Sequence, residues 1–355
     1  MMTPNVAVPI DLLKRFAPGT KLRDAVELIM RQGMGALVVI GAGPAVDEIC
    51  SGGFDLVNVP YTAQRLAELA KMDGGIVVDD ALGMITRANV HFIPDPTIAT
   101  VETGTRFRTA ERLARQTGLP VLAVSEEGRM VAIVFSGDAR FALQTVTELL
   151  AEANQRLQAI ERLRGQFNDA VVRLNRYEAD DVVSMREVVA VIQRAGVIRR
   201  LAEGLDIISA ELGDASSLIS LQSSDLTGGV SEMAELVNID YQRRKPRKGS
   251  SVFSKLDTLS EDDLYDPDTV ADMVGLGALD EHAQPRGARA IARVPRLPDA
   301  VRDSILRRFT SYEKLMGASA DDLAKVDGVG KARARTILSY LHPVSGSGAI
   351  PVVVD

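Results

Sequence analysis

Lys71-Met72-Asp73-Gly74-Gly75 leads directly into the apolar run Ile76-Val77-Val78. A short, continuous apolar run of this kind is typical of a buried strand in an α/β sheet. The two glycines let the backbone come close to a neighbouring group where the strand begins. Asp73 therefore stands at the edge of a predicted sheet, where a carboxylate can hold a divalent ion. Taken alone, Asp-Gly-Gly is a weak signal, because many turns contain it.

Around this stretch, helical and strand patterns alternate over residues 1–142. Helices end at glycine or proline, and the apolar strands are joined by polar turns. This alternation predicts an α/β domain with a mixed, buried sheet. We expect helices over 22–32, 63–71 and 109–117, and strands over 36–40, 76–79, 88–92, 121–125 and 130–135.

A second polar motif, Gly104-Thr105-Arg106-Phe107-Arg108-Thr109-Ala110-Glu111-Arg112, follows in the same domain. Two guanidinium groups, those of Arg106 and Arg108, come just before a helix that we expect Thr109 to cap. Guanidinium groups and the free N–H groups of a helix start both suit phosphate. Together with Asp73, this motif predicts a site for nucleotide chemistry.

From about residue 141 the pattern becomes helical. Apolar residues are spaced by three or four, and no proline occurs between 141 and 244. This spacing predicts a long helix and then further helices, including one over 184–205. A strict seven-residue repeat is missing, so we favour a helical spine over 143–288 to a coiled coil.

The most specific motif lies near the end of the chain, at Val326-Asp327-Gly328-Val329-Gly330-Lys331-Ala332-Arg333-Ala334-Arg335. Gly328 and Gly330 permit a tight turn, and Lys331 and Arg333 add positive charge at the start of the next helix. With helices expected over 319–326 and 331–341, the motif resembles a helix-hairpin-helix, which holds duplex phosphates without reading bases.

Charge is distributed unevenly in a way that agrees with this interpretation. The chain carries a formal net charge of −7, yet Lys and Arg exceed Asp and Glu within 291–345. A basic end on an acidic body indicates a localised contact with a polyanion. A degenerate hairpin upstream, over 291–309, has prolines instead of glycines at its turn, which disfavours a phosphate contact. The alternative is a helical bundle used for protein contacts.

Several classes of protein are excluded. Cys50 is the single cysteine, so the chain forms no internal disulfide and offers no cysteine cluster for zinc. The longest apolar stretch, 34–46, contains glycines and Pro44 and is shorter than the roughly 20 residues of a membrane helix. The N-terminus does not resemble a signal peptide. We expect a cytoplasmic, DNA-associated protein without membrane contact, whose tail, 343–355, is loose.

With these motifs in place, the chain resembles the DNA integrity scanning family of diadenylate cyclases over nearly its whole length. The match covers a cyclase domain (1–142), a helical spine (143–288) and a helix-hairpin-helix domain (289–342). The family carries Asp-Gly-Ala at 73–75 and Gly-Thr-Arg-His-Arg-Thr-Ala-Glu-Arg at 104–112. Val124-Ser125-Glu126-Glu127 also matches.

The resemblance implies that two ATP molecules are condensed into cyclic di-AMP with release of two pyrophosphates. It implies a homo-octamer with facing cyclase domains, and inhibition by branched DNA. Asp73 would bind Mg²⁺ or Mn²⁺ and help activate the 3′-hydroxyl, while Arg106 and Arg108 would bind the triphosphate. The other nucleotide contacts that it implies are Gly74, Gly75, Phe92, Thr105, Phe107, Thr109, Ser125 and Glu126. The DNA contacts would be Gly328, Gly330, Lys331 and Arg333.

This chain departs from the family pattern at two site positions. Gly75 replaces Ala, which removes one methyl group. Phe107 replaces His, and phenylalanine cannot donate a hydrogen bond to phosphate. A lost charge-assisted contact of about 1.5–3 kcal/mol predicts a slow cyclase.

Two other functions remain open on the sequence alone. One is a weak or inactive junction-binding scaffold that still binds nucleotide, which Phe107 favours. The other is a nuclease or repair subunit. The sequence shows no dense acidic cluster, which argues against this function.

Overall fold

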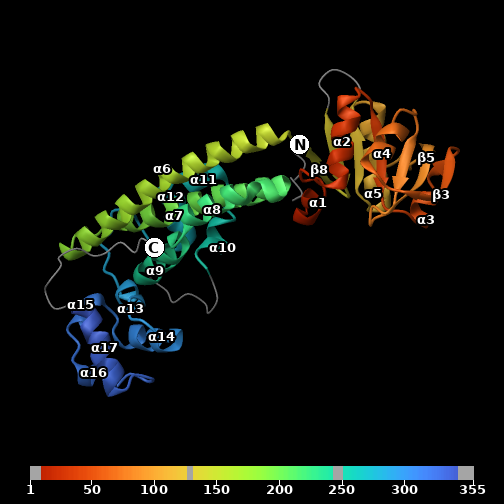
Figure 1. Ribbon diagram of the computed structural model, residues 1–355. Coiled ribbons are helices and arrows are strands. Elements are labelled where there is room, and N and C mark those ends of the chain that lie inside the picture. Colours follow the sequence, from red (N-terminus) through yellow and green to blue (C-terminus); the bar gives the residue numbers. More distant parts are fainter. Residues whose placement is uncertain (1–8, 126–130, 243–250, 343–355) are drawn as a thin grey trace. The chain divides into compact units, whose positions relative to one another are not determined.

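The computed structural model describes residues 9–125, 131–242 and 251–342. The chain divides into two compact units. The first contains Met1–Gln155 and Leu205–Leu221, and the second contains Arg156–Gly204 and Gln222–Asp355. Figure 1 shows a sheet domain and two helical regions. The predicted class, a mixed-sheet α/β domain followed by all-helical regions, is confirmed.

The first unit is built on an eight-stranded sheet. Seven strands follow the order β2-β5-β4-β1-β6-β7-β8, and β3 also pairs with β5. The β1–β4 pair is parallel, and the other described pairs are antiparallel. The strands are β1 (Ala36–Ile40), β2 (Cys50–Ser51), β3 (Phe54–Pro60), β4 (Gly75–Val78), β5 (Met84–Phe92), β6 (Val121–Val124), β7 (Ala132–Ser136) and β8 (Ala139–Ala142).

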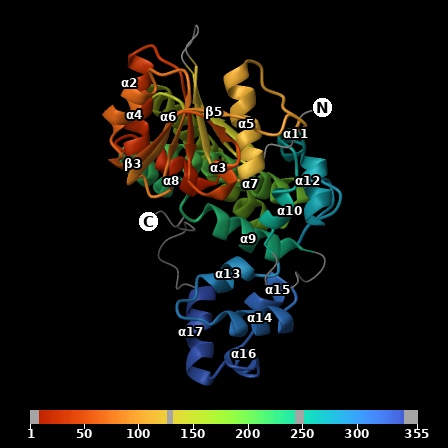
Figure 2. The same ribbon diagram turned by 90° about the vertical axis from the view of Figure 1, so that its right-hand side faces the viewer.

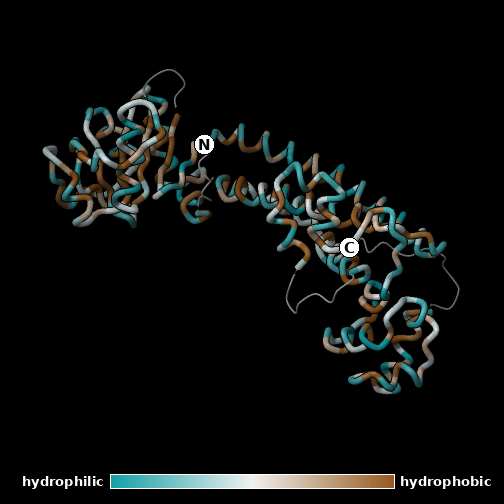
Figure 3. The backbone as a smooth tube through the Cα atoms, turned by 180° about the vertical axis from the view of Figure 1, so that it is seen from behind, coloured by the Kyte–Doolittle hydropathy of each residue, from teal (hydrophilic) through white to brown (hydrophobic). Residues whose placement is uncertain are grey.

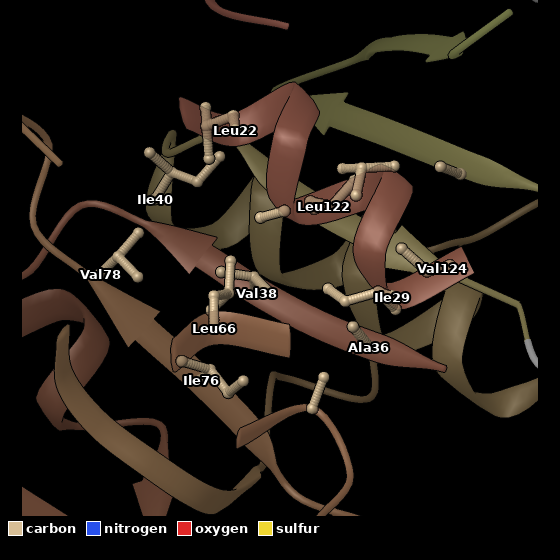
Figure 4. Packing of buried hydrophobic residues seen from close by; sticks show 14 of the residues in the cluster. Leu22, Ile29, Ala36, Val38, Ile40, Leu66, Ile76, Val78, Leu122 and Val124 are labelled. Carbon is tan, nitrogen blue, oxygen red and sulfur yellow. The ribbon is translucent and has the colours of Figure 1, made fainter. Parts of the chain in front are cut away.

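Helices cover both faces of this sheet, as Figure 2 shows. On one face, α2 and α4 bury Leu22, Ile29 and Leu66 against strand residues such as Val38 and Ile76 (Figure 4). On the other face, α5 buries Leu113 and Ala114 among a second set of strand residues. The helices of this domain are α1 (Ile10–Arg15), α2 (Lys21–Arg31), α3 (Pro44–Asp47), α4 (Ala63–Leu69) and α5 (Thr105–Thr117).

The start of α5 differs from the sequence prediction. The helix begins at Thr105 with Gly104 as its N-cap, so Thr109 is not the cap. Gly104 has a φ of 82° and its carbonyl accepts the N–H of Arg108 at 3.1 Å, which places both arginines in the first turn. The Thr109 hydroxyl instead donates to the carbonyl of Thr105 at 2.8 Å within the helix.

Long helices follow the sheet domain, and hydrophilic and hydrophobic segments alternate along them (Figure 3). In the second unit, α7 contacts the segment 253–264. Gln193 of α7 donates to the Leu264 carbonyl at 2.9 Å, and the Arg199 guanidinium lies 4.9 Å from the Phe253 ring centre. The helices up to residue 274 are α6 (Val146–Ala179), α7 (Met185–Leu212), the 3-10 helix η1 (Gly213–Ser216), α8 (Ser217–Thr227), α9 (Val230–Tyr241), α10 (Phe253–Leu256), α11 (Glu261–Tyr265) and α12 (Pro267–Val274).

Five further helices share one apolar core at the end of the described chain. Ile291, Val301 and Ile305 pack in the same cluster as Val326 and Ile337, so the upstream helices and the predicted hairpin form one module. These helices are α13 (Ala288–Ala292), α14 (Asp299–Arg308), α15 (Tyr312–Met316), α16 (Ala320–Ala324) and α17 (Lys331–Leu341). In the described part of the chain, no helix is long and apolar enough to span a membrane. The tail, 343–355, lies outside the described residues.

Candidate nucleotide site and DNA-binding hairpin

A cavity of about 870 Å³ lies at one edge of the sheet. The strand pairing explains its position: β1 and β4 begin at this edge, whereas β5 and β6, antiparallel to them, end there. Nine of the residues predicted for the nucleotide site line this cavity. They are Asp73, Gly74, Gly75, Phe92, Thr105, Arg106, Phe107, Thr109 and Ser125.

Two predicted residues are not among those that line the cavity. Arg108 is exposed in the first turn of α5, next to the lining residues Phe107 and Thr109. Glu126 lies outside the described residues.

Asp73 is exposed at the cavity, two residues before β4 begins. Within residues 9–125, 131–242 and 251–342, no hydrogen bond or ion pair engages its carboxylate. An exposed carboxylate without a protein partner contributes little to stability and can bind a ligand.

The start of α5 points positive groups at the same cavity. Gly104 caps the helix without a side chain, so the N–H groups of the first turn have no side-chain acceptor there. The Arg106 guanidinium lines the cavity and donates to the Val124 carbonyl at 3.3 Å, at the end of β6. A helix N-terminus with a guanidinium beside it can bind an anion such as phosphate.

The loop that precedes α5 is anchored by the helix itself. Glu111, which is 5% exposed, accepts the Thr100 hydroxyl and the Val101 N–H, the latter at 3.2 Å. Its charge is balanced by Arg115, whose Nη2 lies 3.0 Å from Oε1 of Glu111. Arg112 donates to the Ile98 carbonyl at 2.9 Å. These bonds fix the approach of the chain to Gly104, and thereby the position of the helix start.

Phe107 is half-buried and packs against the apolar cluster on the α5 face of the sheet, which includes Ala110 and Ala114 of its own helix. Residues three, four or seven positions apart on a helix share a face in this way. The ring of Phe107 therefore belongs partly to the core and partly to the cavity wall.

Asn89 lines the cavity and was missed by the sequence analysis. It lies in β5 where the register with β4 shifts, and it has a φ of 55°. Asparagine adopts this left-handed conformation more readily than most residues. Its Oδ1 accepts the N–H of Gly74 at 3.1 Å and so holds the segment that carries Asp73.

We expect Asn89→Gly to weaken nucleotide binding about fivefold, because one hydrogen bond of about 1 kcal/mol is lost while the backbone conformation stays accessible. Isothermal titration calorimetry measures this change. Asn58→Gly is the matched control: Asn58 has a φ of 56° but is exposed in β3, away from the lining residues. Equal nucleotide affinities for the two variants would contradict the role given to Asn89.

Like Asn89, most of the remaining residues that line the cavity belong to no distinctive sequence motif. They enter the site because sheet pairing and the turn before α5 bring separate segments to one edge. They are Gly35, Ala36, Leu37, Met72, Val90, His91, Thr103 and Gly104.

The hairpin between α16 and α17 has the geometry expected of a phosphate-binding turn. Gly328 has a φ of 81°, and a Cβ added there would lie 2.8 Å from Cγ2 of Val301. Gly330 has open space where its side chain would be, and it caps α17 without a side-chain acceptor. A phosphate could therefore approach the first N–H groups of α17.

The charged residues of the hairpin differ in their surroundings. Lys331 is exposed, and no described residue forms a hydrogen bond or ion pair with its ammonium group. Arg333 donates from Nη1 to the Gly328 carbonyl at 2.5 Å and so helps to hold the turn. In the upstream hairpin, Arg296 takes the left-handed position with a φ of 55°, and Asp299 opens α14. An acidic first turn disfavours phosphate, so the upstream turn is the weaker anion site.

The residues at the cavity fit a divalent ion that is bound mainly through a substrate. The described residues contain no group of three or more His, Cys, Asp or Glu side chains that could enclose a metal. Mg²⁺ is often held by one or two carboxylates together with substrate phosphates and water. Asp73, exposed and without a protein partner, suits that mode of binding.

The fold and these sites define a class: a nucleotide-binding α/β domain joined through helices to a DNA-binding hairpin module. Comparison with known families agrees with each part. Residues 23–139 match the nucleotide-binding domain of the DisA bacterial checkpoint controller, and 143–282 match its linker region. Residues 311–340 match the helix-hairpin-helix motif.

Whole-length relatives identify the family. The DNA integrity scanning protein DisA of Parafrankia sp. is 40% identical over 344 residues, 95% of each chain. That of Kineococcus radiotolerans is 42% identical over 341 residues, 94% of each chain. The chain belongs to the DNA integrity scanning protein DisA family and is a diadenylate cyclase with a DNA-binding helix-hairpin-helix module.

Among solved structures, DacA from Staphylococcus aureus matches 40% of this chain and 95% of its own, with a TM-score of 0.30 and 20% identity. This overall similarity is too low to add to the family assignment.

Proposed function

We propose that this chain condenses two ATP molecules into cyclic di-AMP and releases two pyrophosphates. The observation that carries the proposal is the placement of Asp73, Arg106 and the first turn of α5 around one cavity. A carboxylate on one side and positive groups on the other suit a nucleotide bound by its sugar and its phosphates at once.

Each bound ATP supplies both a nucleophile and an electrophile. The 3′-oxygen of one nucleotide attacks the α-phosphorus of the other, the new O–P bond forms, and the bond to the pyrophosphate leaving group breaks. The same step in the opposite direction closes the ring. Because the cavity of one chain holds one nucleotide under this scheme, two cyclase domains must face each other, and we place them within a homo-octamer.

Different residues around the cavity position different parts of the nucleotide. Arg106 and Arg108 neutralise the triphosphate, and Thr105 and Thr109 lie beside it at the start of α5. Gly74, Gly75, Phe92 and Ser125 form walls against the nucleoside, and Phe107 lies in the first turn of α5 beside the phosphates. Glu126 is a further contact by family resemblance. Phosphoryl transfer depends mainly on such positioning and charge neutralisation.

Asp73 would hold Mg²⁺ or Mn²⁺ together with the phosphates and accept the hydrogen bond of the attacking 3′-hydroxyl. When bound, the ion supplies charge neutralisation for the triphosphate. Asp73 itself orients the hydroxyl and draws its proton away as the new bond forms.

The direct test is incubation of the purified chain with ATP and Mn²⁺, followed by chromatography and mass identification of the products. Cyclic di-AMP and pyrophosphate are expected. A chain that bound ATP and branched DNA but formed no product would instead act as a junction-binding scaffold.

Phe107→His should raise the rate of synthesis about tenfold, because histidine can donate a hydrogen bond to phosphate where phenylalanine cannot. Steady-state product formation measures the change. Phe107→Leu is the matched control, since it stays apolar and should give no gain. Fast synthesis by the original chain, unchanged by histidine, would contradict the slow-cyclase prediction.

The helix-hairpin-helix module, 289–342, would hold duplex or branched DNA by its phosphates through Gly328, Gly330, Lys331 and Arg333. Branched DNA bound there would restrain synthesis by the cyclase domain, 1–142, with the spine, 143–288, between them. We place this activity in the cytoplasm, in association with DNA.

Lys331→Glu should weaken binding to a four-way DNA junction about tenfold at moderate salt and leave ATP turnover unchanged, because a phosphate contact is replaced by repulsion. Fluorescence anisotropy with a labelled junction measures this affinity. Lys314→Glu is the matched control: it makes the same charge change at an exposed position of α15. Equal losses for both variants would show that net charge, and not the α16–α17 turn, governs binding.

A further inference from the structure

Gly75 is buried at the start of β4, and the ring of Phe92 fills the space where a side chain would be. A Cβ added at Gly75 would lie 2.0 Å from Cε2 of Phe92 and 2.5 Å from its Cδ2. Both distances are far inside van der Waals contact, so an alanine at position 75 requires the ring to move.

The ring of Phe92 has little room to move away from the cavity. Phe92 is 6% exposed and belongs to the apolar cluster that includes Val90 and Leu113. Its backbone is paired with Cys50 of β2. Since the cluster closes one side and both Gly75 and Phe92 line the cavity, a displaced ring moves toward the cavity.

Gly74 is constrained in a different way. A Cβ added there would lie 2.4 Å from the carbonyl carbon of Asn89 and 2.5 Å from its Cα. Gly74 is therefore restricted by the backbone of β5, whereas Gly75 is restricted by one side chain. Only the second restriction can be relieved by replacing a side chain.

We propose that Gly75 and Phe92 form a matched pair that sets the width of the nucleotide cavity beside Asp73. The family pattern has alanine at position 75; here the phenyl ring occupies the volume of that methyl group. The observed position of the Phe92 ring thus requires glycine at position 75. Both are positioning residues for an adenine nucleotide. The identity of the ligand rests on the proposed function, while the steric pairing does not.

The test is a double-mutant cycle with Gly75→Ala and Phe92→Leu, each alone and together. The probe is an ATP analogue with a methylene bridge between its α- and β-phosphates, bound in the presence of Mn²⁺ and measured by calorimetry. Gly75→Ala should weaken binding about tenfold through overpacking. In the Phe92→Leu background, adding Gly75→Ala should change the affinity by less than about twofold.

Gly74→Ala is the matched control, because Phe92→Leu should not rescue it. If Gly75→Ala alone does not fold, the comparison of Phe92→Leu with the double variant still decides the matter. Additive effects of the two substitutions would overturn the pairing. Rescue of the melting temperature without any change in analogue binding would show a structural contact with no role in the cavity, and would also overturn the proposal.

These outcomes are separate from those that test the reaction. A chain that binds the analogue but makes no cyclic di-AMP contradicts the proposed function, while the cycle of binding affinities still tests the pair. Conversely, cyclic di-AMP synthesis together with additive effects refutes only the pairing.

Discussion

Replacing Asp73 by asparagine should lower the rate of cyclic di-AMP synthesis about a hundredfold or more. The carboxylate is exposed at the cavity, and no described residue pairs with it, so its removal should leave the fold intact. Asparagine keeps the size and one oxygen but loses the negative charge. Under the proposed mechanism, that charge binds the divalent ion and attracts the proton of the attacking 3′-hydroxyl.

The measurement is product formation from ATP and Mn²⁺, with the melting temperature and junction affinity determined for the same samples. Asp11→Asn is the matched control, since Asp11 is exposed in the first turn of α1 and does not line the cavity. A rate for Asp73→Asn equal to that of Asp11→Asn would remove Asp73 from the mechanism.

The sequence predicted the central strands well because burial on both faces leaves a continuous apolar run. The residues expected over 36–40 are those of β1, and the run at 76–79 differs from β4 by one residue at each end. The outer strand β3 was missed because most of its residues are exposed and its apolar alternation changes phase between Leu56 and Val57, within the stretch where its register with β5 shifts. The short strands β2 and β8 have only a few residues each and owe their conformation to their neighbours.

The start of α5 shows how a general rule can give a wrong boundary. Thr109 was expected to cap the helix because threonine is a favoured N-cap residue. Gly104, with its positive φ, begins the helix earlier and brings Arg106 into its first turn. Gly104 was visible in the sequence, but glycine is only a modest N-cap signal and more often follows a helix.

Cavity residues that carry a local sequence signal could be predicted. Those brought to the cavity only by strand pairing could not. Asp73 and Arg106 stand out as charges beside glycines or a helix start. Asn89 is one polar residue inside a strand, and only the register shift of β5 against β4 directs its side chain to Gly74. The contact between Phe92 and Gly75 likewise exists only once β4 and β5 are paired.

Arg289→Ala should lower the free energy of unfolding of the second unit by about 3–5 kcal/mol, because two carboxylates would lose a buried partner. The Arg289 side chain is 10% exposed, and its Nε lies 2.8 Å from Oδ2 of Asp240. Its Nη2 also pairs with Glu178, and its Nη1 donates to Asn175 at 3.0 Å. Burial lowers the pKa of Arg289, but the carboxylates of Asp240 and Glu178 more than offset this effect, so the pKa is raised overall.

The same carboxylate also organises the helix-hairpin-helix module. Oδ1 of Asp240 accepts the N–H of Gly287 at 2.8 Å and that of Ala288, and so caps α13 from α9. The ion pair with Arg289 holds Asp240 where it can cap α13. The loss on Arg289→Ala therefore includes a weaker attachment of α13 as well as an unpaired charge.

Urea unfolding followed by circular dichroism measures this loss. Arg186→Ala is the matched control, because its ion pair with Asp280 is exposed on both sides and contributes little. A similar, small loss for both variants would mean that the ion pairs of Arg289 with Asp240 and Glu178 do not hold the module to the spine.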